Sequence, residues 1–369
     1  MECTQDLWER LAASNKTVVL YGMGNGADKI LDVCREKGIT VSGVFASDGF
    51  SRGNLFHGMP VMTWSETREK WGRENLCVLL AFGTSRPEVL ENILRIGEEA
   101  ELLVPDVPAF GDALFDRAFF EAHREELAAA RALLSDEESR RVFDLVVEYK
   151  LTGRLDLLLA ARSDESATWR DLIRPETLTA TADLGAYNGD TVRELLAKTS
   201  TVKSVVAMEP DARNYKKLSE YASRETRAEI RAVHAGAWSE KTVLTFEKSG
   251  NRNASFDQNR SSVLAERPVK LVEIDALPLD AVLDGARVDY IKYDVEGSER
   301  EAILGSQGTL DRDSPTLLVS LYHRSEDLFA LPLLLHERFP AYNAFYLRRF
   351  GGVPAWDLNL YVKKENDNA

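Results

Sequence analysis

Short apolar runs alternate with helical patterns over the first 110 or so residues of the chain. A short apolar run bounded by turn residues is typical of a strand that is covered on both faces of a sheet. After the first run, residues 27–37 place Ile30, Leu31 and Cys34 on one helical face. Strands that alternate with helices predict a parallel α/β layer. Its strands are expected at 17–21, 41–46 and 76–82.

The middle of the chain, residues 116–161, carries a helical pattern and no strand pattern. Leu127, Arg131 and Leu134 recur at helical spacing. The segment 135–138 (SDEE) then combines an N-cap residue with an acidic first turn, which indicates the start of another helix. We expect two or three helices that link two domains.

A second α/β series opens at residue 179 and again alternates apolar strands with helices. A Gly-Gly-Val-Pro loop joins the last two strands, which is typical of an antiparallel hairpin at a sheet edge. Strands are expected at 179–184, 204–209, 229–234, 290–294, 316–321, 344–350 and 358–362. The prediction is therefore an α/β protein with two tandem Rossmann-like domains, at 1–112 and 176–369, joined by a helical linker at 113–175.

Composition limits the classes of partner. The 369 residues carry a net charge of −14, which disfavours a nucleic-acid partner. No apolar stretch has the length of a membrane span, and the start of the chain lacks the apolar run of a secretory signal. Cys3, Cys34 and Cys77 are odd in number and far apart, which favours a reducing compartment. We expect a cytoplasmic protein without a metal site, and an oligomer is left open.

The strongest chemical signal is a glycine loop after an apolar strand, DLGAYNGDT at 183–191. Gly185 and Gly189 would let the backbone pass close to a ligand. Glu209 ends the next strand 24 residues after Gly185, close to the spacing of a ribose-binding acid. A structural turn is the alternative for any single glycine loop. However, DVEG at 294–297 ends a further strand, and all three segments would meet at one sheet edge.

These motifs resemble the FkbM family of methyltransferases. The resemblance rests on DLGAYNGDT (183–191), EPD (209–211) and IKYDVEGSE (291–299), in that order, and covers roughly residues 170–365. It implies a class I methyltransferase fold, S-adenosylmethionine as cofactor and methyl transfer, commonly to a hydroxyl.

The resemblance also implies roles for individual residues. Asp183, Gly185 and Gly189 would lie beside the methionine part of the cofactor, and Glu209 would hold the ribose. Asp211 and the segment 235–238 would flank the adenine, although Trp238 is more often core filling. The predicted cofactor-binding residues are Asp183, Gly185, Ala186, Gly189, Asp190, Thr191, Glu209, Asp211, Ala235 and Asp294.

A hydroxyl acceptor must lose a proton, so a general base is expected within hydrogen-bond reach. The candidates are Asp294, Glu296 and His323, because each follows a strand at the same edge. Three alternatives stay open. The acidic residues could start the helix that includes Glu299, two carboxylates could hold a divalent ion, and His323 could cap a loop.

Two further groups of polar residues are candidates for acceptor binding. Arg324, Arg348 and Arg349 could bind an acidic acceptor, or they could be solvated surface. A polar loop that could close over the site contains Asn253, Ser255 and Gln258.

The N-terminal series has a glycine loop of its own. Gly22, Gly24 and Ala27 match a dinucleotide fingerprint between a strand and a helix, and Asp48 follows Gly24 by 24 residues. A nucleotide or nucleotide-sugar could bind there. Such a domain could equally be kept for packing or dimerisation.

The leading interpretation is an O-methyltransferase that acts on a hydroxyl of a sugar, glycan or related small metabolite. The alternatives are a nucleotide-sugar-binding protein and an NAD-dependent sugar-modifying enzyme that uses the N-terminal loop. No Tyr-x-x-x-Lys spacing supports a short-chain dehydrogenase. An amino-methyltransferase of nucleic acids is disfavoured, because DVEG stands where such enzymes carry an Asn/Asp-Pro-Pro-Tyr/Phe segment.

Overall fold

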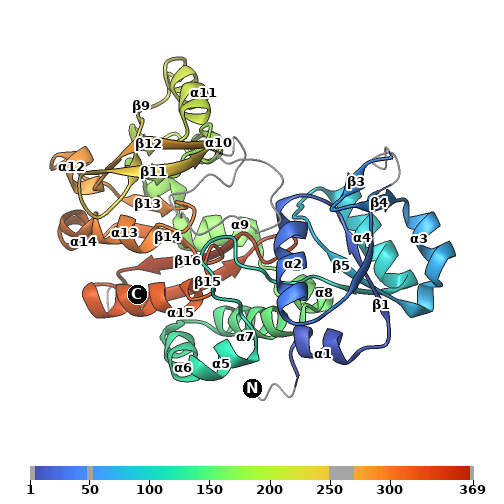
Figure 1. Ribbon diagram of the computed structural model, residues 1–369. Coiled ribbons are helices and arrows are strands. Elements are labelled where there is room, and N and C mark those ends of the chain that lie inside the picture. Colours follow the sequence, from blue (N-terminus) through green and yellow to red (C-terminus); the bar gives the residue numbers. More distant parts are fainter. Residues whose placement is uncertain (1–4, 48–52, 249–269, 366–369) are drawn as a thin grey trace.

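The computed structural model describes residues 5–47, 53–248 and 270–365. Two α/β layers lie side by side, one from the N-terminal third of the chain and one from its C-terminal half (Figure 1). Helices from the middle of the chain run along the lower side of the second layer. No described helix combines the length and the apolar character needed to cross a membrane.

The first layer is a six-stranded sheet in the order β3-β4-β2-β1-β5-β6, parallel except for β3. The three strands expected from the sequence are confirmed, and three short ones were not predicted. Its strands are β1 (Thr17–Tyr21), β2 (Val41–Phe45), β3 (Leu55–Phe56), β4 (Met59–Met62), β5 (Leu76–Leu80) and β6 (Glu101–Leu103). The helices are α1 (Leu7–Ala13), α2 (Asn25–Glu36), α3 (Trp64–Trp71) and α4 (Pro87–Glu99).

The middle of the chain forms more helices than expected, and they are not a simple spacer. Asp136 caps α7 by accepting a hydrogen bond from the Ser139 backbone N–H at 2.8 Å, as the sequence predicted. Apolar residues of α6 and α7 belong to the same core as the second sheet. The helices are α5 (Arg117–Ala122), α6 (Arg124–Leu133), α7 (Glu137–Thr152), α8 (Leu155–Ala160) and α9 (Glu165–Thr168), with a π-helical turn at Trp169–Ile173.

The second layer is a seven-stranded sheet in the order β15-β16-β14-β13-β7-β8-β9. Strands β14, β13, β7, β8 and β9 are parallel, and the hairpin β15–β16 adds antiparallel strands at one edge, as predicted. Its strands are β7 (Ala180–Leu184), β8 (Ser204–Met208), β9 (Glu229–Val233), β13 (Tyr290–Tyr293), β14 (Thr316–Ser320), β15 (Ala344–Arg349) and β16 (Leu358–Lys363). The helices are α10 (Asp190–Lys198), α11 (Ala212–Ala222), α12 (Leu279–Leu283), α13 (Glu299–Leu304), α14 (Gln307–Asp313) and α15 (Asp327–Arg338).

A small three-stranded sheet was missed from the sequence. It pairs β10 (Gly236–Ala237), β12 (Lys270–Leu277) and β11 (Thr242–Lys248). In β12, Glu273 and Asp275 are exposed whereas Ile274 and Ala276 are buried. That alternation is the signal of a strand with one face in water, and it is weaker than an uninterrupted apolar run.

The two layers are joined directly, because the loop after β5 pairs with the loop between β15 and β16. Thr84 and Val353 exchange two backbone hydrogen bonds, at 2.8 and 2.9 Å. Val353 and Ala355 are buried in one apolar cluster with Tyr21 and Phe45 of the first sheet. The hairpin edge of the second layer is therefore fixed against the first.

Candidate active site

A cavity of about 700 Å³ lies at the carboxyl ends of β7, β8, β13 and β14. Ligands bind in such a position in doubly wound sheets. Its lining also includes residues from the loop after β5, from α9 and from the β15–β16 loop. The cavity is therefore built by both layers and by the helices between them.

The glycine loop predicted from the sequence starts directly after β7 and ends in α10. Gly185 and Gly189 have φ values of +84° and +83°. A Cβ at Gly185 would overlap the carbonyl oxygen of Asp294, and one at Gly189 would lie 2.9 Å from the Tyr221 ring. Glycine is therefore needed for packing within the chain, a reason the sequence did not supply.

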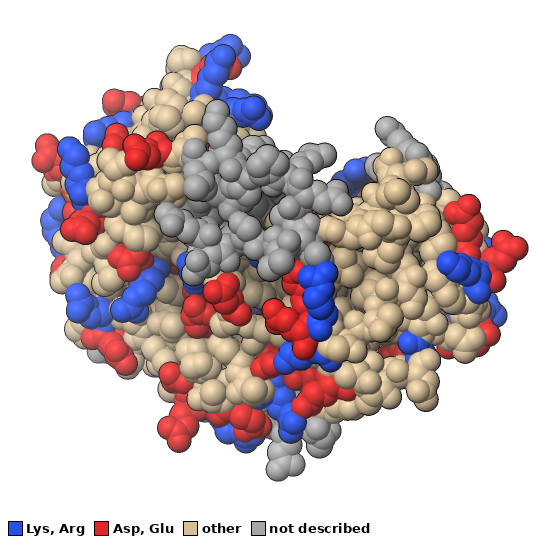
Figure 2. Space-filling model, in the orientation of Figure 1, with Lys and Arg blue, Asp and Glu red and all other residues tan. Residues whose placement is uncertain are grey.

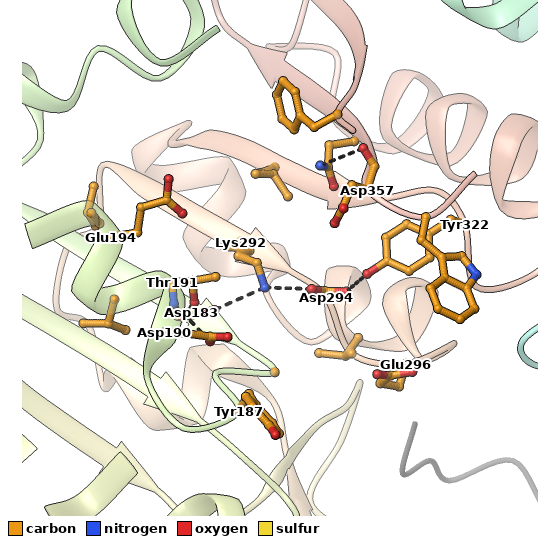
Figure 3. Close-up of a pocket in the computed structure, with 18 of the residues that line it drawn as sticks. Asp183, Tyr187, Asp190, Thr191, Glu194, Lys292, Asp294, Glu296, Tyr322 and Asp357 are labelled. Atoms are coloured by element: carbon orange, nitrogen blue, oxygen red, sulfur yellow. Dashed lines mark hydrogen bonds and ion pairs between the residues drawn. The ribbon is translucent and has the colours of Figure 1, made fainter. Parts of the chain in front are cut away.

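Lys292 joins two of the predicted site residues. Register places it beside Asp183 on the neighbouring strand. Its ammonium lies 3.6 Å from Asp183 Oδ1 and 3.0 Å from Asp294 Oδ2 (Figure 3). Thr191 donates its hydroxyl hydrogen to Asp183 Oδ2. Burial alone would lower the pKa of Lys292, but Asp294 and Asp183 hold it above its usual value.

Glu209 lies where a ribose-binding acid is expected, at the end of β8. Its carboxylate accepts backbone N–H hydrogen bonds from Tyr187 and Asp211, both at 2.8 Å. Burial of the side chain raises its pKa to about 7, although these two hydrogen bonds favour the charged form. Glu209 lines the cavity. The loop geometry thus holds this carboxylate at the cavity wall.

Several predicted cofactor-binding residues lie behind the wall rather than on it. Asp211 caps α11 through the backbone N–H groups of Arg213 and Asn214, at 2.9 and 3.0 Å. Ala186 and Ala235 are buried among apolar neighbours. The predicted residues on the cavity wall are Asp183, Gly185, Asp190, Thr191, Glu209, Asp294, Glu296 and His323. Gly236 and Ala237, from the segment 235–238 that was expected to flank the adenine, also line the cavity, as does Asn214, which was not predicted.

The three candidate bases come together as the sequence predicted. His323 Nε2 lies 3.6 Å from Asp294 Oδ1 and 3.6 Å from Glu296 Oε2. Glu299 Oε1 lies 2.8 Å from His323 Nδ1, and both side chains are buried. Tyr322 donates its hydroxyl hydrogen to Asp294 Oδ1 at 2.8 Å. Glu296 has a left-handed backbone, with φ of +55°, which is unusual for a residue with a side chain.

The charges around His323 determine whether this residue can act as a general base. Burial alone would lower the pKa of His323, but Glu299, Glu296 and Asp294 raise it to about 10. The ring is therefore an imidazolium at neutral pH and has no lone pair with which to accept a proton. Burial likewise opposes ionisation of Asp294, yet Lys292 and His323 hold the pKa of Asp294 well below its ordinary value.

Three neighbours of the candidate bases were missed from the sequence. Lys292 and Glu299 lie in the quoted motif 291–299, and Tyr322 directly precedes His323, yet none was assigned a role in the chemistry. Glu299 was interpreted as the acidic first turn of a helix, and it does begin α13. Its burial against His323 depends on the approach of the start of α13 to the segment after β14, which local sequence does not reveal.

The arginines proposed for an acidic acceptor do not line the cavity. Arg348 pairs with Asp136, its Nη1 lying 3.3 Å from Asp136 Oδ1. Arg349 is buried and donates to the Leu158 carbonyl at 2.7 Å. Arg324 donates from Nε to the Gly297 carbonyl at 2.9 Å. These contacts give the three side chains structural roles.

The N-terminal glycine loop is separate from this cavity, because Gly22, Gly24 and Ala27 do not line it. A Cβ at Gly22 would meet the Phe82 ring at 2.5 Å, so close packing accounts for that glycine. Asp48 lies outside the described residues, as do Asn253, Ser255 and Gln258. Within the described ranges, no group of three or more His, Cys, Asp or Glu side chains is arranged to hold a metal ion.

The chain is similar to solved structures to different extents. A methyltransferase FkbM from Methylobacillus flagellatus KT aligns over 95% of this chain and 90% of its own, with 21% identity and a TM-score of 0.70. An rRNA methylase from Streptococcus thermophilus aligns over 52% of this chain and 92% of its own, with 14% identity and a TM-score of 0.34. Fibrillarin from Aeropyrum pernix, solved with natively bound S-adenosyl-L-methionine, aligns over 50% of this chain and 66% of its own, with 12% identity and a TM-score of 0.31. No curated protein sequence matches the chain.

The doubly wound sheet and the cavity at its carboxyl edge, with their glycine loop and acidic strand ends, define a methyltransferase whose cofactor is S-adenosylmethionine. Residues 183–344 match the sequence profile of the methyltransferase FkbM domain.

Proposed function

We propose that the protein transfers the methyl group of S-adenosylmethionine to a hydroxyl of a sugar, glycan or related small metabolite. The observation that carries the proposal is the arrangement of one cavity. Glu209 lies at the end of β8, whereas Glu296 and His323 lie across the sheet edge at β13 and β14. The acid expected to hold the ribose and the carboxylate proposed to accept a proton, Glu209 and Glu296, thus line one cavity.

The residues on the wall fit the cofactor. Asp183 Oδ1 is buried without a hydrogen-bond partner, although Lys292 lies nearby, so it can accept a hydrogen bond from an ammonium. Glu209 would accept hydrogen bonds from the ribose hydroxyls, and the start of α10 would face the methionine carboxylate. When bound, S-adenosylmethionine supplies an electrophilic methyl group on a sulfonium.

Glu296 would take the proton of the acceptor hydroxyl. His323 is positively charged and therefore cannot, and Asp294 is already engaged by Lys292 and Tyr322. The acceptor oxygen forms a bond to the methyl carbon, the carbon–sulfur bond breaks, and the hydroxyl proton passes to the Glu296 carboxylate. In this proposal His323 is a positioning residue that holds Glu296 through charge, and Glu299 fixes the imidazolium.

The cofactor site is tested by titrating S-adenosylhomocysteine into the protein by calorimetry. Glu209→Gln should weaken binding by about tenfold or more, because it removes the charge that accepts the ribose hydrogen bonds. Glu220→Gln, at an exposed glutamate of α11, should bind as the wild type does. Equal affinity of Glu209→Gln and wild type would contradict the assigned role.

Methyl transfer to the acceptor is tested by measuring turnover once an acceptor has been identified. Glu296→Gln should lower kcat by about a hundredfold with cofactor affinity unchanged, the scale of a lost general base. His323→Gln should lower kcat less. A Glu296→Gln variant with full turnover would assign the proton to another acceptor.

The N-terminal glycine loop carries no second proposal. A nucleotide or nucleotide-sugar at Gly22, Gly24 and Ala27 stays a prediction from the sequence, as does an oligomer.

A further inference from the structure

The cavity has a wall that the methyltransferase sheet does not supply. On one side of this wall, Gly83 to Arg86 come from the loop after β5 in the first layer. The other side consists of residues from the loop of the β15–β16 hairpin, namely Phe350, Gly352, Val353, Trp356 and Asp357. We call these two loops together the interlayer wall. The glycine loop and Glu209 lie on other elements, so the wall is separate from the cofactor-binding residues.

The interlayer wall is a fixed structure. Thr84 and Val353 pair through two backbone hydrogen bonds, and Val353 is 2% exposed. A Cβ at Gly83 would overlap the Trp356 ring, so this ring lies directly on the glycine backbone. Trp356 is nevertheless 39% exposed. A large ring is thus held against one loop while much of its surface remains open to solvent.

Carboxylates outnumber the cationic side chains of Arg86, Lys292 and His323 on the cavity lining, which disfavours binding of an anion. Asp294, Glu296 and Asp357 lie toward the same end of the cavity as Tyr322 (Figure 3). The Arg86 guanidinium is paired, since its Nε lies 2.7 Å from Glu88 Oε1. Carboxylates accept hydrogen bonds from hydroxyl groups and repel other carboxylates or phosphates. Elsewhere on the molecule, acidic and basic side chains are intermixed on the face shown in Figure 2.

We propose that the interlayer wall is the binding subsite for a neutral sugar ring of the acceptor. The apolar face of the ring would lie on Trp356, and Asp357 would accept hydrogen bonds from its hydroxyls. This places the ring beside Glu296, as the proposed methyl transfer requires, and the inference rests on that proposed function. The first layer then sets acceptor specificity, and an acidic sugar is excluded.

The test measures sugar binding separately from cofactor binding. The protein saturated with S-adenosylhomocysteine is titrated with neutral methyl glycosides of glucose, galactose, mannose, rhamnose and fucose, and with glucuronate, by saturation-transfer NMR. At least one neutral glycoside should bind and glucuronate should not. Trp356→Ala should weaken that binding by about fivefold to tenfold, and Trp356→Phe should restore most of it.

A perturbation from the first layer makes the test specific. Gly83→Ala forces the Trp356 ring to move and should weaken glycoside binding as Trp356→Ala does, with the affinity for S-adenosylhomocysteine unchanged. Gly97→Ala is the matched control, because a Cβ there meets only Leu102 Cβ at an ordinary 3.8 Å. The inference would be overturned if the wild type bound only glucuronate or bound no glycoside. It would also be overturned if Gly83→Ala and Trp356→Ala bound the glycosides as strongly as the wild type does. Failure of the wild type to bind S-adenosylhomocysteine would instead contradict the proposed cofactor site.

Discussion

Single backbone positions decide how closely the strands of the site approach one another. At Gly185 the chain passes so near the Asp294 carbonyl that no side-chain atom fits. Tyr187 and Glu296, with φ of +48° and +55°, hold the left-handed conformation that glycine usually takes. All three residues line the cavity, so unusual backbone conformations occur where the chemistry is expected.

Gly185→Ala should therefore lower the stability of the protein more than an alanine substitution at another glycine with a left-handed backbone does. We expect it to lower the free energy of unfolding by roughly 2 kcal/mol more than Gly38→Ala and to abolish S-adenosylhomocysteine binding. Gly38 has φ of +70°, and a Cβ added there would have no neighbouring atom within 4 Å, so it reports the backbone cost alone. Urea unfolding and calorimetry measure the two effects. Equal loss in both variants would show that the contact with Asp294 is unimportant.

The charge of His323 makes stability depend on pH. Its pKa is raised to about 10 in the folded protein, so the stabilising contribution is complete below about pH 6.5 and is lost as pH rises through 10. Between pH 7 and 10, we expect the unfolding free energy of the wild type to fall by roughly 3 kcal/mol more than that of His323→Gln. His336→Gln, at an exposed histidine of α15, should follow the wild type. Parallel curves for wild type and His323→Gln in urea unfolding would contradict the charged ring.

At the scale of elements, helix α7, which was predicted from its N-cap and acidic first turn, also positions the β15–β16 hairpin of the second sheet. Asp136 both caps α7 and pairs with Arg348 of β15. Ser139 Oγ accepts from the Leu347 backbone N–H at 2.9 Å and from Arg348 Nη1 at 2.8 Å. The first turn of α7 is thereby attached to the hairpin whose far end forms the interlayer wall.

Asp136→Ala should cost about 3 kcal/mol of unfolding free energy, because it removes the cap and leaves Arg348 nearly buried without its main partner. Thr63→Ala removes a cap of α3 at an exposed position and should cost about 1 kcal/mol. Thermal and urea unfolding compare the variants. A cost for Asp136→Ala no larger than for Thr63→Ala would show that the pair with Arg348 contributes nothing.

At the scale of the whole molecule, the two layers share both a core and a cavity. Tyr21 and Phe45 of the first sheet cluster with Val353 and Ala355 of the hairpin, and Tyr149 of α7 joins them. A boundary between independent domains is therefore not expected at the end of the first sheet. The predicted linker helices instead complete the core of the second layer.

The shared core predicts that both layers unfold together. S-adenosylhomocysteine at about a hundred times its Kd should raise the stability by ~2.7 kcal/mol in one cooperative transition. Hydrogen exchange should then slow in β1 and β5 as well as in β7 and β13, because opening either layer exposes the same cluster. Calorimetric unfolding with two separate transitions, only one of them shifted by the ligand, would contradict this expectation.

The sequence by itself determined the alternation of apolar strands and helices, and with it both parallel sheets and the edge hairpin. Strong apolar runs such as LCVLLAF at 76–82 are local, so they were found, while the alternating Glu273 to Ala276 was overlooked. The motifs also predicted that Asp294, Glu296 and His323 lie close together, because residues after parallel strands must meet at one edge. These inferences need only short-range pattern and the geometry of parallel sheets.

Only the tertiary structure decided which groups surround those residues and what charge they carry. Glu299 reaches His323, and Lys292 reaches Asp183, across elements that are not adjacent in the sequence. The pKa of a buried group depends on every charge packed against it, so the change of His323 from a candidate base to an imidazolium could not be read from its own segment. The contact of Gly83 with Trp356 likewise joins residues far apart in the chain, and it exists because the two layers pack together.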